Sequence, residues 1–265
     1  MSNKKIAVIG VGNMGGAIVA GLIKSSFVSP SKIFVFDIRE SILNNFEKTG
    51  VNIAGHSLDA ARNSDVIILA VKPVYVEKVI HEIRPALNSD KILISIAAGV
   101  SISDLEEMCG KDISIFRVMP NTAVAVQQSL TCITGNEAGK SEAQYVVQLF
   151  DQMGKTIEIP ENLMSAATVL SSCGIAFALR FIRAAVQGGV GIGFGATEAD
   201  LIAAQTVKGA AELILLSGNH PESEIDRVTT PGGITIAGLN EMEHNGFSSS
   251  LVKGIEAAYK KIENK

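Results

Sequence analysis

The 265-residue chain has no tryptophan, and aromatic residues make up only 5% of it. Its three cysteines, Cys109, Cys132 and Cys173, are odd in number and far apart in the sequence. They form neither a disulfide framework nor a metal-ligand spacing, so we expect a protein of the reducing cytoplasm that holds no metal. The net charge is −4, and the scattered basic residues form no stripe, which argues against nucleic acid as a partner.

The chain also lacks the patterns of a signal peptide and of a membrane span. Residues 5–9 are apolar but run directly into glycines, without the long apolar segment that a signal peptide needs. The most apolar stretch, residues 163–179, contains Ser171, Ser172 and Gly174 and is followed closely by two arginines. We therefore expect a buried or interfacial helix there and no membrane partner.

The first part of the chain alternates apolar, β-branched runs with helical patterns. Such runs are typical of parallel strands that are covered on both faces. The alternation predicts an α/β Rossmann domain over residues 1–160, with a doubly wound, mostly parallel sheet. One of the intervening helices carries a capping signal, Ser103 with Glu106. The expected strands are residues 6–10, 32–37, 65–71, 91–97 and 113–119, with two shorter ones near 130–134 and 155–159.

After Pro160 the strand-like runs stop, and residues 161–265 have helical spacing almost throughout. The segment is rich in small and apolar residues, as in AAVQGGVGIGFGA, residues 184–196. Small residues let helices approach closely, and so much apolar surface in a small helical unit needs a second subunit to cover it. The sequence predicts an all-α domain over residues 161–265 that mediates self-association.

A glycine-rich loop follows the first expected strand. The sequence GVGNMG, residues 10–15, has the G-x-G-x-x-G spacing between a strand and a helix, which predicts a dinucleotide phosphate site. The first glycine permits a tight turn, the second lets the backbone approach a pyrophosphate, and the third lets the helix pack on the sheet. Free N–H groups at the helix start then face the anion. The predicted contacts are Gly10, Gly12, Asn13, Met14 and Gly15.

Two charged residues at the end of the second strand give opposite indications of the cofactor. Asp37 stands where an acidic residue would bind a ribose 2′-hydroxyl and favour NAD. Arg39, two residues later, would instead hold a 2′-phosphate and favour NADP. The sequence leaves both alternatives open.

Three further loops leave the carboxyl ends of expected strands, where ligands bind in open α/β sheets. They are AVKP, residues 70–73, AAGV, residues 97–100, and MPNT, residues 119–122. Small residues in two of them leave room for a flat nicotinamide ring, and a lysine and an asparagine offer hydrogen-bond donors. The predicted cofactor contacts are Ala70, Val71, Lys72, Pro73, Ala97, Ala98 and Asn121.

Near the end of the chain, VTTPGGITIAGL, residues 228–239, places Pro-Gly-Gly at the start of a helical pattern. Thr230 is the expected N-cap, and Pro231 the expected first helical residue. The next backbone N–H groups are then free to bind a small anion such as a carboxylate, with a threonine hydroxyl beside it. A kinked turn that binds nothing is the alternative. The predicted substrate contacts are Thr230, Gly232, Gly233, Ile234 and Thr235.

Five blocks together resemble the pyrroline-5-carboxylate reductase family over nearly the whole chain. They are IGVGNMGGAI, LAVKP, SIAAGVS, RVMPNTA and VTTPGGITIAGL, the last followed by GF at 246–247. The last block is specific, whereas the first is common to many dehydrogenases. One run departs from the family pattern S-G-S-x-P-A-Y: it reads LSSCGIAF, residues 170–177, with Ile175 for the proline and Phe177 for the tyrosine.

The resemblance implies reduction of the cyclic imine 1-pyrroline-5-carboxylate to L-proline, with NADPH or NADH as the cofactor. It also implies a homodimer built through the helical domain, commonly assembled into a ring of five dimers. In that family the substrate carboxylate lies on the segment matching residues 230–235. The threonine matching Thr235 hydrogen-bonds the ring nitrogen, so Thr235 is the expected catalytic residue.

Two rival functions fit parts of the pattern. A β-hydroxyacid dehydrogenase also joins a Rossmann domain to a helical one, and it needs a lysine acid/base, for which Lys208 is the candidate. That reading leaves the Pro-Gly-Gly segment unexplained. A non-catalytic nucleotide-binding regulator would share the fold, but the complete threonine and glycine set argues against it.

Overall fold

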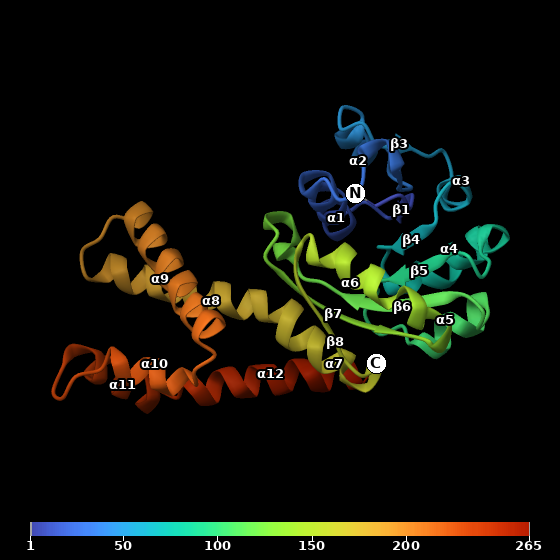
Figure 1. The fold of residues 1–265 in the computed structure, drawn as a ribbon. Helices are drawn as coiled ribbons and strands as arrows, with labels where there is room; N and C mark the ends of the chain where they lie inside the picture. The colour runs from blue at the N-terminus through green and yellow to red at the C-terminus, as the bar shows by residue number, and fades with distance from the viewer. Residues whose placement is uncertain (1, 265) are drawn as a thin grey trace. The chain divides into compact units, whose positions relative to one another are not determined.

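A computed structural model of the chain describes residues 2–264 (Figure 1). The N-terminal part holds one eight-stranded sheet with the order β3-β2-β1-β4-β5-β6-β7-β8. Every neighbouring pair is parallel except β6 and β7, which are antiparallel. The strands are β1 (Ile6–Ile9), β2 (Ile33–Phe36), β3 (Asn52–Ile53), β4 (Val66–Leu69), β5 (Ile92–Ser95), β6 (Ser114–Met119), β7 (Ser129–Gly135) and β8 (Gly154–Glu158).

The sheet has a hydrophobic core on each face because successive strand residues point to opposite sides. On one face Ile6 and Val8 join a cluster with residues of α1 and α6. On the other face Ala7 and Ile9 join a cluster with residues of α3, α4 and α5. The helices are α1 (Asn13–Ser25), α2 (Glu40–Leu43), α3 (Ser57–Arg62), α4 (Val76–Ile83), α5 (Ile102–Cys109) and α6 (Ala143–Asp151).

This arrangement confirms the predicted doubly wound sheet and all seven expected strands, and it adds β3, which has two residues. The predicted capping signal was wrong by two positions: Ser101 caps α5, its hydroxyl accepts from the Asp104 N–H, and the Asp104 carboxylate accepts from the Ser101 N–H. The strand order reverses direction at β1, which pairs with β2 on one side and β4 on the other. The loops after β1 and β4 therefore flank the switch point, where ligands bind in such sheets.

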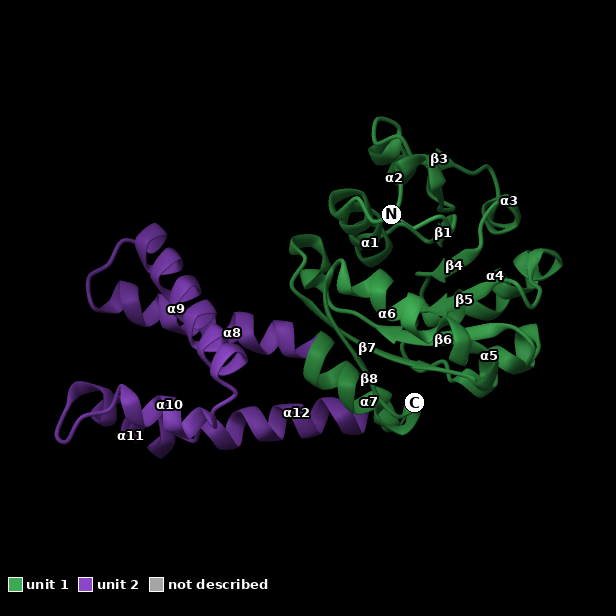
Figure 2. Ribbon diagram, viewed as in Figure 1, with its two compact units in different colours: residues 1–172, 262–265 green, residues 173–261 purple. Residues whose placement is uncertain are grey.

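The chain divides into two compact units, the first ending at Ser172 and the second beginning at Cys173 (Figure 2). The first unit also takes in the end of α12 from Ile262. The predicted boundary near residue 160 falls between the end of β8 and the first helical residue, Glu161. The compact division lies later because Met164, on the following helix, packs with Met119 and Cys132 of the sheet domain.

The second unit is entirely helical. Its internal core is one small cluster in which Val186 of α8 packs with Ala199 and Ala203 of α9. Phe181 and Phe247 also meet edge to face, with ring centroids 6.0 Å apart. The helices from Met164 on are α7 (Met164–Ala167), α8 (Gly174–Gly191), α9 (Ala196–Ser217), α10 (Pro221–Arg227), α11 (Ile234–His244) and α12 (Phe247–Glu263), with a π-helical turn, η8 (Thr168–Cys173), between α7 and α8.

One continuous helical run, Glu161–Gly191, is long and apolar enough to cross a membrane, and 11% of its most apolar window is buried within the chain. A single run of this kind is weak support for a membrane span, since helices covered by other protein surfaces have the same composition. The run contains Arg180 and Arg183, which a lipid-facing helix would have to bury at high cost.

Candidate active site

The glycine loop and the loop after β4 are in direct contact at the switch point. Gly10 has φ +91°, which favours glycine, and its N–H donates to the Phe36 carbonyl at 2.7 Å. A Cβ at Gly10 would lie 2.8 Å from the Ala70 carbonyl oxygen, and a Cβ at Gly15 would overlap the Gly10 carbonyl. The loop can therefore adopt this path only with glycine at both positions.

The start of α1 offers backbone donors with no protein acceptor in its first turn. Gly12 is the N-cap and contributes no side-chain hydrogen bond. The first intrahelical bond runs from the Gly16 N–H to the Gly12 carbonyl at 2.8 Å, so the N–H groups of Asn13, Met14 and Gly15 precede the helical ladder. Oriented N–H groups at a helix start suit a phosphate.

Asp37 and Arg39 form an ion pair beside the glycine loop. The Arg39 Nε donates to one carboxylate oxygen at 3.0 Å, its Nη2 donates to the other at 3.2 Å, and its backbone N–H donates as well at 3.0 Å. Asp37 is buried, whereas the Arg39 side chain is 59% exposed. A Cβ at Gly12 would lie 3.2 Å from the Arg39 Nη2, so the guanidinium lies against the loop.

The ion pair fixes the charge of both groups. Burial acts to raise the pKa of the Asp37 carboxyl, but the hydrogen bonds and the positive charge of Arg39 outweigh it, and the pKa lies below its usual value. The carboxylate therefore stays ionised and raises the pKa of Arg39. The two sequence signals are not independent, because Arg39 donates three hydrogen bonds to the carboxylate that was expected to accept from a ribose.

The loops after β4 and β5 lie next to each other at the same edge of the sheet. The Ala70 N–H donates to Ile9 at 2.8 Å, and the Ile96 N–H donates to Leu69 at 3.1 Å. These bonds bring together the ends of β1, β4 and β5. Ala70 and Val71 are half-buried, Ala97 is buried, and the exposed residues are Lys72, Pro73 and Ala98.

Asn121 differs from its predicted role as a free donor. Its side chain is buried at 5% exposure, and its Oδ1 accepts from the Ala123 N–H at 3.0 Å. Its Nδ2 is directed at the carbonyl and hydroxyl oxygens of Ser171, both at 3.4 Å. Asn121 thus orders its own loop, and sequence reasoning missed Ser171 as its partner.

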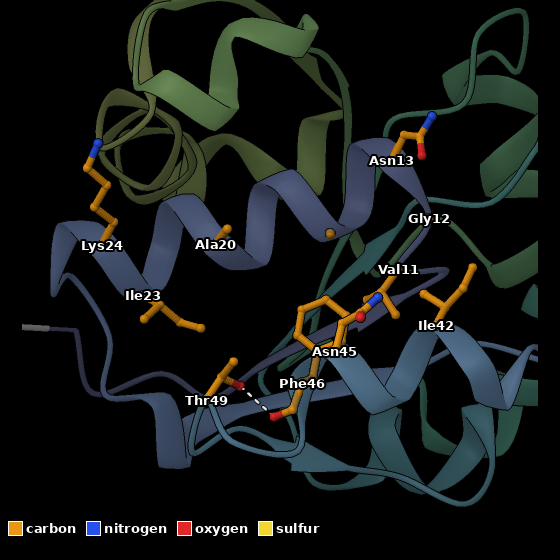
Figure 3. A pocket seen from close by; sticks show the side chains of 11 residues that line it. Val11, Gly12, Asn13, Ala20, Ile23, Lys24, Ile42, Asn45, Phe46 and Thr49 are labelled. Atoms are coloured by element: carbon orange, nitrogen blue, oxygen red, sulfur yellow. Dashed lines mark hydrogen bonds between the residues drawn. The ribbon is translucent and has the colours of Figure 1, made fainter.

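A cavity of about 550 Å³ opens on the flank of α1 (Figure 3). Its lining combines residues of α1 with Ile42, Asn45, Phe46 and Thr49, and it shares only Gly12 and Asn13 with the predicted cofactor contacts. No residue from the loops after β4, β5 or β6 lines it. The cavity therefore borders the glycine loop but not the loops that follow β4, β5 and β6.

In the helical unit, the Pro-Gly-Gly segment forms a turn before α11, which corrects the predicted cap. The Gly233 N–H donates to the Thr230 carbonyl at 2.9 Å, and Gly232 has φ +67°, as in a type II turn with proline at its second position. Gly233, not Thr230, is the N-cap, and the helix begins at Ile234. A Cβ at Gly233 would overlap the Thr230 hydroxyl. The turn therefore requires glycine at 232 for its positive φ and at 233 for space.

The free N–H donors at the start of α11 lie further along the chain than the sequence predicts. Since Gly233 donates within the turn, the groups that precede the helical ladder are the N–H groups of Ile234, Thr235 and Ile236. Thr235 lies at the second helical position and is half-buried, while Ile234 is exposed. An anion held by these donors would have the Thr235 hydroxyl within the same turn.

Within residues 2–264, no three His, Cys, Asp or Glu side chains come together as metal ligands. Lys208, the lysine considered for a β-hydroxyacid dehydrogenase, lies exposed on α9.

Comparison with known proteins decides the family. A family model described as "Pyrroline-5-carboxylate reductase dimerisation" matches residues 161–265, and one described as "NADP oxidoreductase coenzyme F420-dependent" matches residues 5–99. The chain is 40% identical to pyrroline-5-carboxylate reductase 2 of Dictyostelium discoideum over 96% of its own length and 90% of the relative. The chain belongs to the pyrroline-5-carboxylate reductase family.

Other members of the reductase family match in sequence and in fold. The chain is also 40% identical to pyrroline-5-carboxylate reductase 1 of Dictyostelium discoideum, but it spans about half of that protein, 48% of its length. A crystal structure of Plasmodium falciparum pyrroline carboxylate reductase with NADP bound superimposes with a TM-score of 0.91 at 32% identity, covering 100% of this chain and 98% of that one. The helical domain of this chain is therefore the family's dimerisation domain.

Proposed function

We propose that the protein reduces 1-pyrroline-5-carboxylate to L-proline with NADPH. The observation that carries the proposal is 40% identity over 96% of the chain to a curated reductase of the same extent. The structure supports it with two separate features, a glycine loop at the switch point of the sheet and free backbone donors at the start of α11. The β-hydroxyacid dehydrogenase alternative rests on Lys208, and no observation favours it.

The glycine loop and the neighbouring loops fit a dinucleotide. Gly10 and Gly15 allow the tight path of the loop, because a Cβ at either position would collide with a backbone carbonyl. The N–H groups at the start of α1 suit the pyrophosphate. We assign cofactor contacts to the residues predicted from the sequence, with Asn121 ordering its loop instead of donating. When bound, the reduced nicotinamide supplies the hydride that the imine carbon accepts.

The Asp37 and Arg39 pair favours NADPH over NADH. Asp37 accepts three hydrogen bonds from Arg39, which leaves its oxygens less able to receive ribose hydroxyls. The guanidinium is held against the glycine loop with its outer side exposed, which suits a 2′-phosphate. The NADP in the Plasmodium falciparum structure is consistent with this preference.

The segment before α11 is the proposed carboxylate site. Three N–H groups, those of Ile234, Thr235 and Ile236, offer donors and the positive end of the helix dipole. The turn formed by Thr230, Gly232 and Gly233 shapes the approach to these donors. This differs from the sequence prediction, in which the Gly233 N–H itself bound the anion.

Thr235 is the proposed catalytic residue. Its hydroxyl can hold the ring nitrogen in place while the N–H groups of the same turn hold the carboxylate, and it can pass a proton to that nitrogen through water. Hydride addition to a protonated imine needs no strong base, so orientation of the two reactants supplies most of the acceleration, roughly 7–11 kcal/mol.

The dimerisation domain implies self-association, and we propose a dimer as the building unit, assembled further into a ring of five. We further propose a cytoplasmic location, in keeping with three unpaired cysteines. Burial raises the pKa of the Cys109 thiol to about 11, so this cysteine is inert at neutral pH.

Product analysis tests the proposal. Purified protein incubated with NADPH and pyrroline-5-carboxylate should form L-proline and NADP in a one-to-one ratio. Thr235→Ala serves as the matched control, because it removes one hydroxyl and leaves the backbone donors in place. Folded protein that binds NADPH yet forms no proline would instead support the non-catalytic regulator.

A further inference from the structure

A π-helical turn interrupts the helical run that follows the sheet domain. It spans Thr168–Cys173, and it places Ser171 and Ser172 at successive positions of a widened turn. Turns of this kind are rare and occur frequently at functional sites. A serine or threonine within a helix commonly bonds to a carbonyl one turn earlier, as Thr168 does with Met164 at 2.8 Å. The two serines do not follow that pattern.

Both serine hydroxyls donate to the sheet domain instead of to their own helix. The Ser172 hydroxyl donates to the Pro120 carbonyl at 2.9 Å, and the Ser171 hydroxyl donates to the Leu130 carbonyl, also at 2.9 Å. Ser171 is buried at 9% exposure, so its hydroxyl is shielded from water and depends on these protein partners. All of these residues belong to the first compact unit.

These bonds complete a set that fixes the loop after β6. The Asn121 N–H donates to the Ser129 hydroxyl at 3.1 Å, and its side-chain amide spans from the Ala123 N–H to Ser171. The peptide from Pro120 to Asn121 is therefore held from β7, from its own loop and from the π turn. The loop leaves the carboxyl end of β6, which neighbours β5 in the parallel part of the sheet. Ligands bind at that edge.

We propose that Ser171 and Ser172 are positioning residues for hydride transfer. They hold the segment Pro120–Asn121 as a rigid wall of the nicotinamide site and touch neither the cofactor nor the substrate. The inference rests on the proposed function, because it assigns a role within the same site. Hydride transfer depends steeply on the separation of donor and acceptor, so a small loosening of this wall lowers the rate of the chemical step more than it weakens binding.

Ser172→Ala and Ser171→Ala test the proposal in the full-length protein. Each variant should lower kcat by about tenfold, with KM for NADPH and for pyrroline-5-carboxylate changed by less than about twofold. The primary kinetic isotope effect with NADPH deuterated at nicotinamide C4 should rise, because the chemical step becomes more rate-limiting. Ser172→Thr, which keeps the hydroxyl, should restore most of the rate.

Thr168→Val is the matched control, because it removes a hydroxyl from the same π turn that bonds only within its own helix. A decrease in kcat no larger than in this control, or an unchanged isotope effect in both serine variants, would overturn the proposal. A wild-type protein without turnover would contradict the proposed function itself. If one serine variant does not fold, the kinetics of the other variant still test the proposal, because the two hydroxyls donate to different carbonyls.

Discussion

The sheet domain and the helical unit are both rich in apolar residues, but they differ in how many of these residues they bury. In the sheet domain the apolar strand residues are buried from both sides by helices of the same chain. In the helical unit one small cluster is buried, whereas large apolar side chains such as Leu201 at 70% and Leu216 at 83% remain exposed on α9. The same chain thus contains one complete core and one incomplete core.

The difference shows that the sheet domain buries its hydrophobic core within one chain, whereas the helical unit does not. A helical unit with this much exposed apolar surface is stabilised when another surface covers it, and the match to a dimerisation domain identifies that surface as a second copy. The loops proposed to bind the cofactor belong to the complete half, and the proposed carboxylate site belongs to the incomplete half. We infer that cofactor binding withstands loss of the dimer better than turnover does.

The largest expected effect follows from a charge placed on the incomplete core. Leu201→Glu should convert the wild-type oligomer to monomer or aggregate and lower turnover by more than about tenfold, because an unpaired carboxylate would have to be buried at the interface. Light scattering after size exclusion and the rate of NADPH oxidation measure the two effects. Ile53→Glu, an exposed apolar position on edge strand β3, is the control. A fully active Leu201→Glu dimer would refute this reading of α9.

Thr235→Ala should produce the next largest effect, since it removes the hydroxyl proposed to hold the ring nitrogen. We expect kcat to fall by about 10²-fold with the oligomer and the NADPH affinity intact. Thr235→Ser, which keeps a hydroxyl, should recover a large part of the rate. An undiminished rate in Thr235→Ala would remove the residue from the mechanism.

In the sheet domain, Arg39→Gln should weaken NADPH selectively. Loss of the guanidinium should raise KM for NADPH by about tenfold and leave KM for NADH nearly unchanged, because only NADPH carries the 2′-phosphate. Initial rates with both cofactors measure this selectivity. Equal changes for the two cofactors would show that Arg39 supports the loop and does not recognise the phosphate.

A stability change is expected at the turn before α11. Gly233→Ala should lower the free energy of unfolding by about 1–3 kcal/mol, because its Cβ would overlap the Thr230 hydroxyl. The same substitution in a Thr230→Ala background should cost less, and thermal unfolding of the four proteins gives the coupling. Equal costs in both backgrounds would show that the contact between these residues is unimportant.

The smallest expected effect is the pH dependence of the Asp37 ion pair. Since its folded-state pKa lies below the usual value near 3.9, the pair contributes stability above about pH 4 and loses it as the pH falls further. Asp37→Asn should therefore be less stable than wild type at pH 7, and the gap in Tm should narrow toward pH 3. A gap that widens on acidification would contradict the ion pair.

Much of the fold could be predicted because long apolar, β-branched runs are typical of buried parallel strands. The runs at 65–71 and 113–119 mark β4 and β6, whereas β3 is too short to give a pattern. The sequence places the N-cap of α11 at Thr230 instead of Gly233, because threonine followed by proline suits both a helix start and a type II turn. Only the positive φ of Gly232 distinguishes them.

Other features of the site depend on contacts that local sequence does not encode. Asn121 and Ser171 are 50 residues apart, so their pairing follows from the fold and from the π turn. The sequence shows that Asp37 and Arg39 favour different cofactors. It does not show that the two side chains form an ion pair with each other. The places of the loops after β1, β4, β5 and β6 can be predicted because each loop directly follows a recognisable strand, whereas their contacts with a cofactor stay a prediction.

The most direct test is the initial rate of cofactor oxidation with pyrroline-5-carboxylate, measured in parallel with NADPH and NADH on one preparation of known molar mass. We predict turnover by an oligomer, faster with NADPH at subsaturating cofactor. A folded oligomer that binds NADPH but oxidises neither cofactor would contradict the assignment of this chain as a reductase of the cyclic imine.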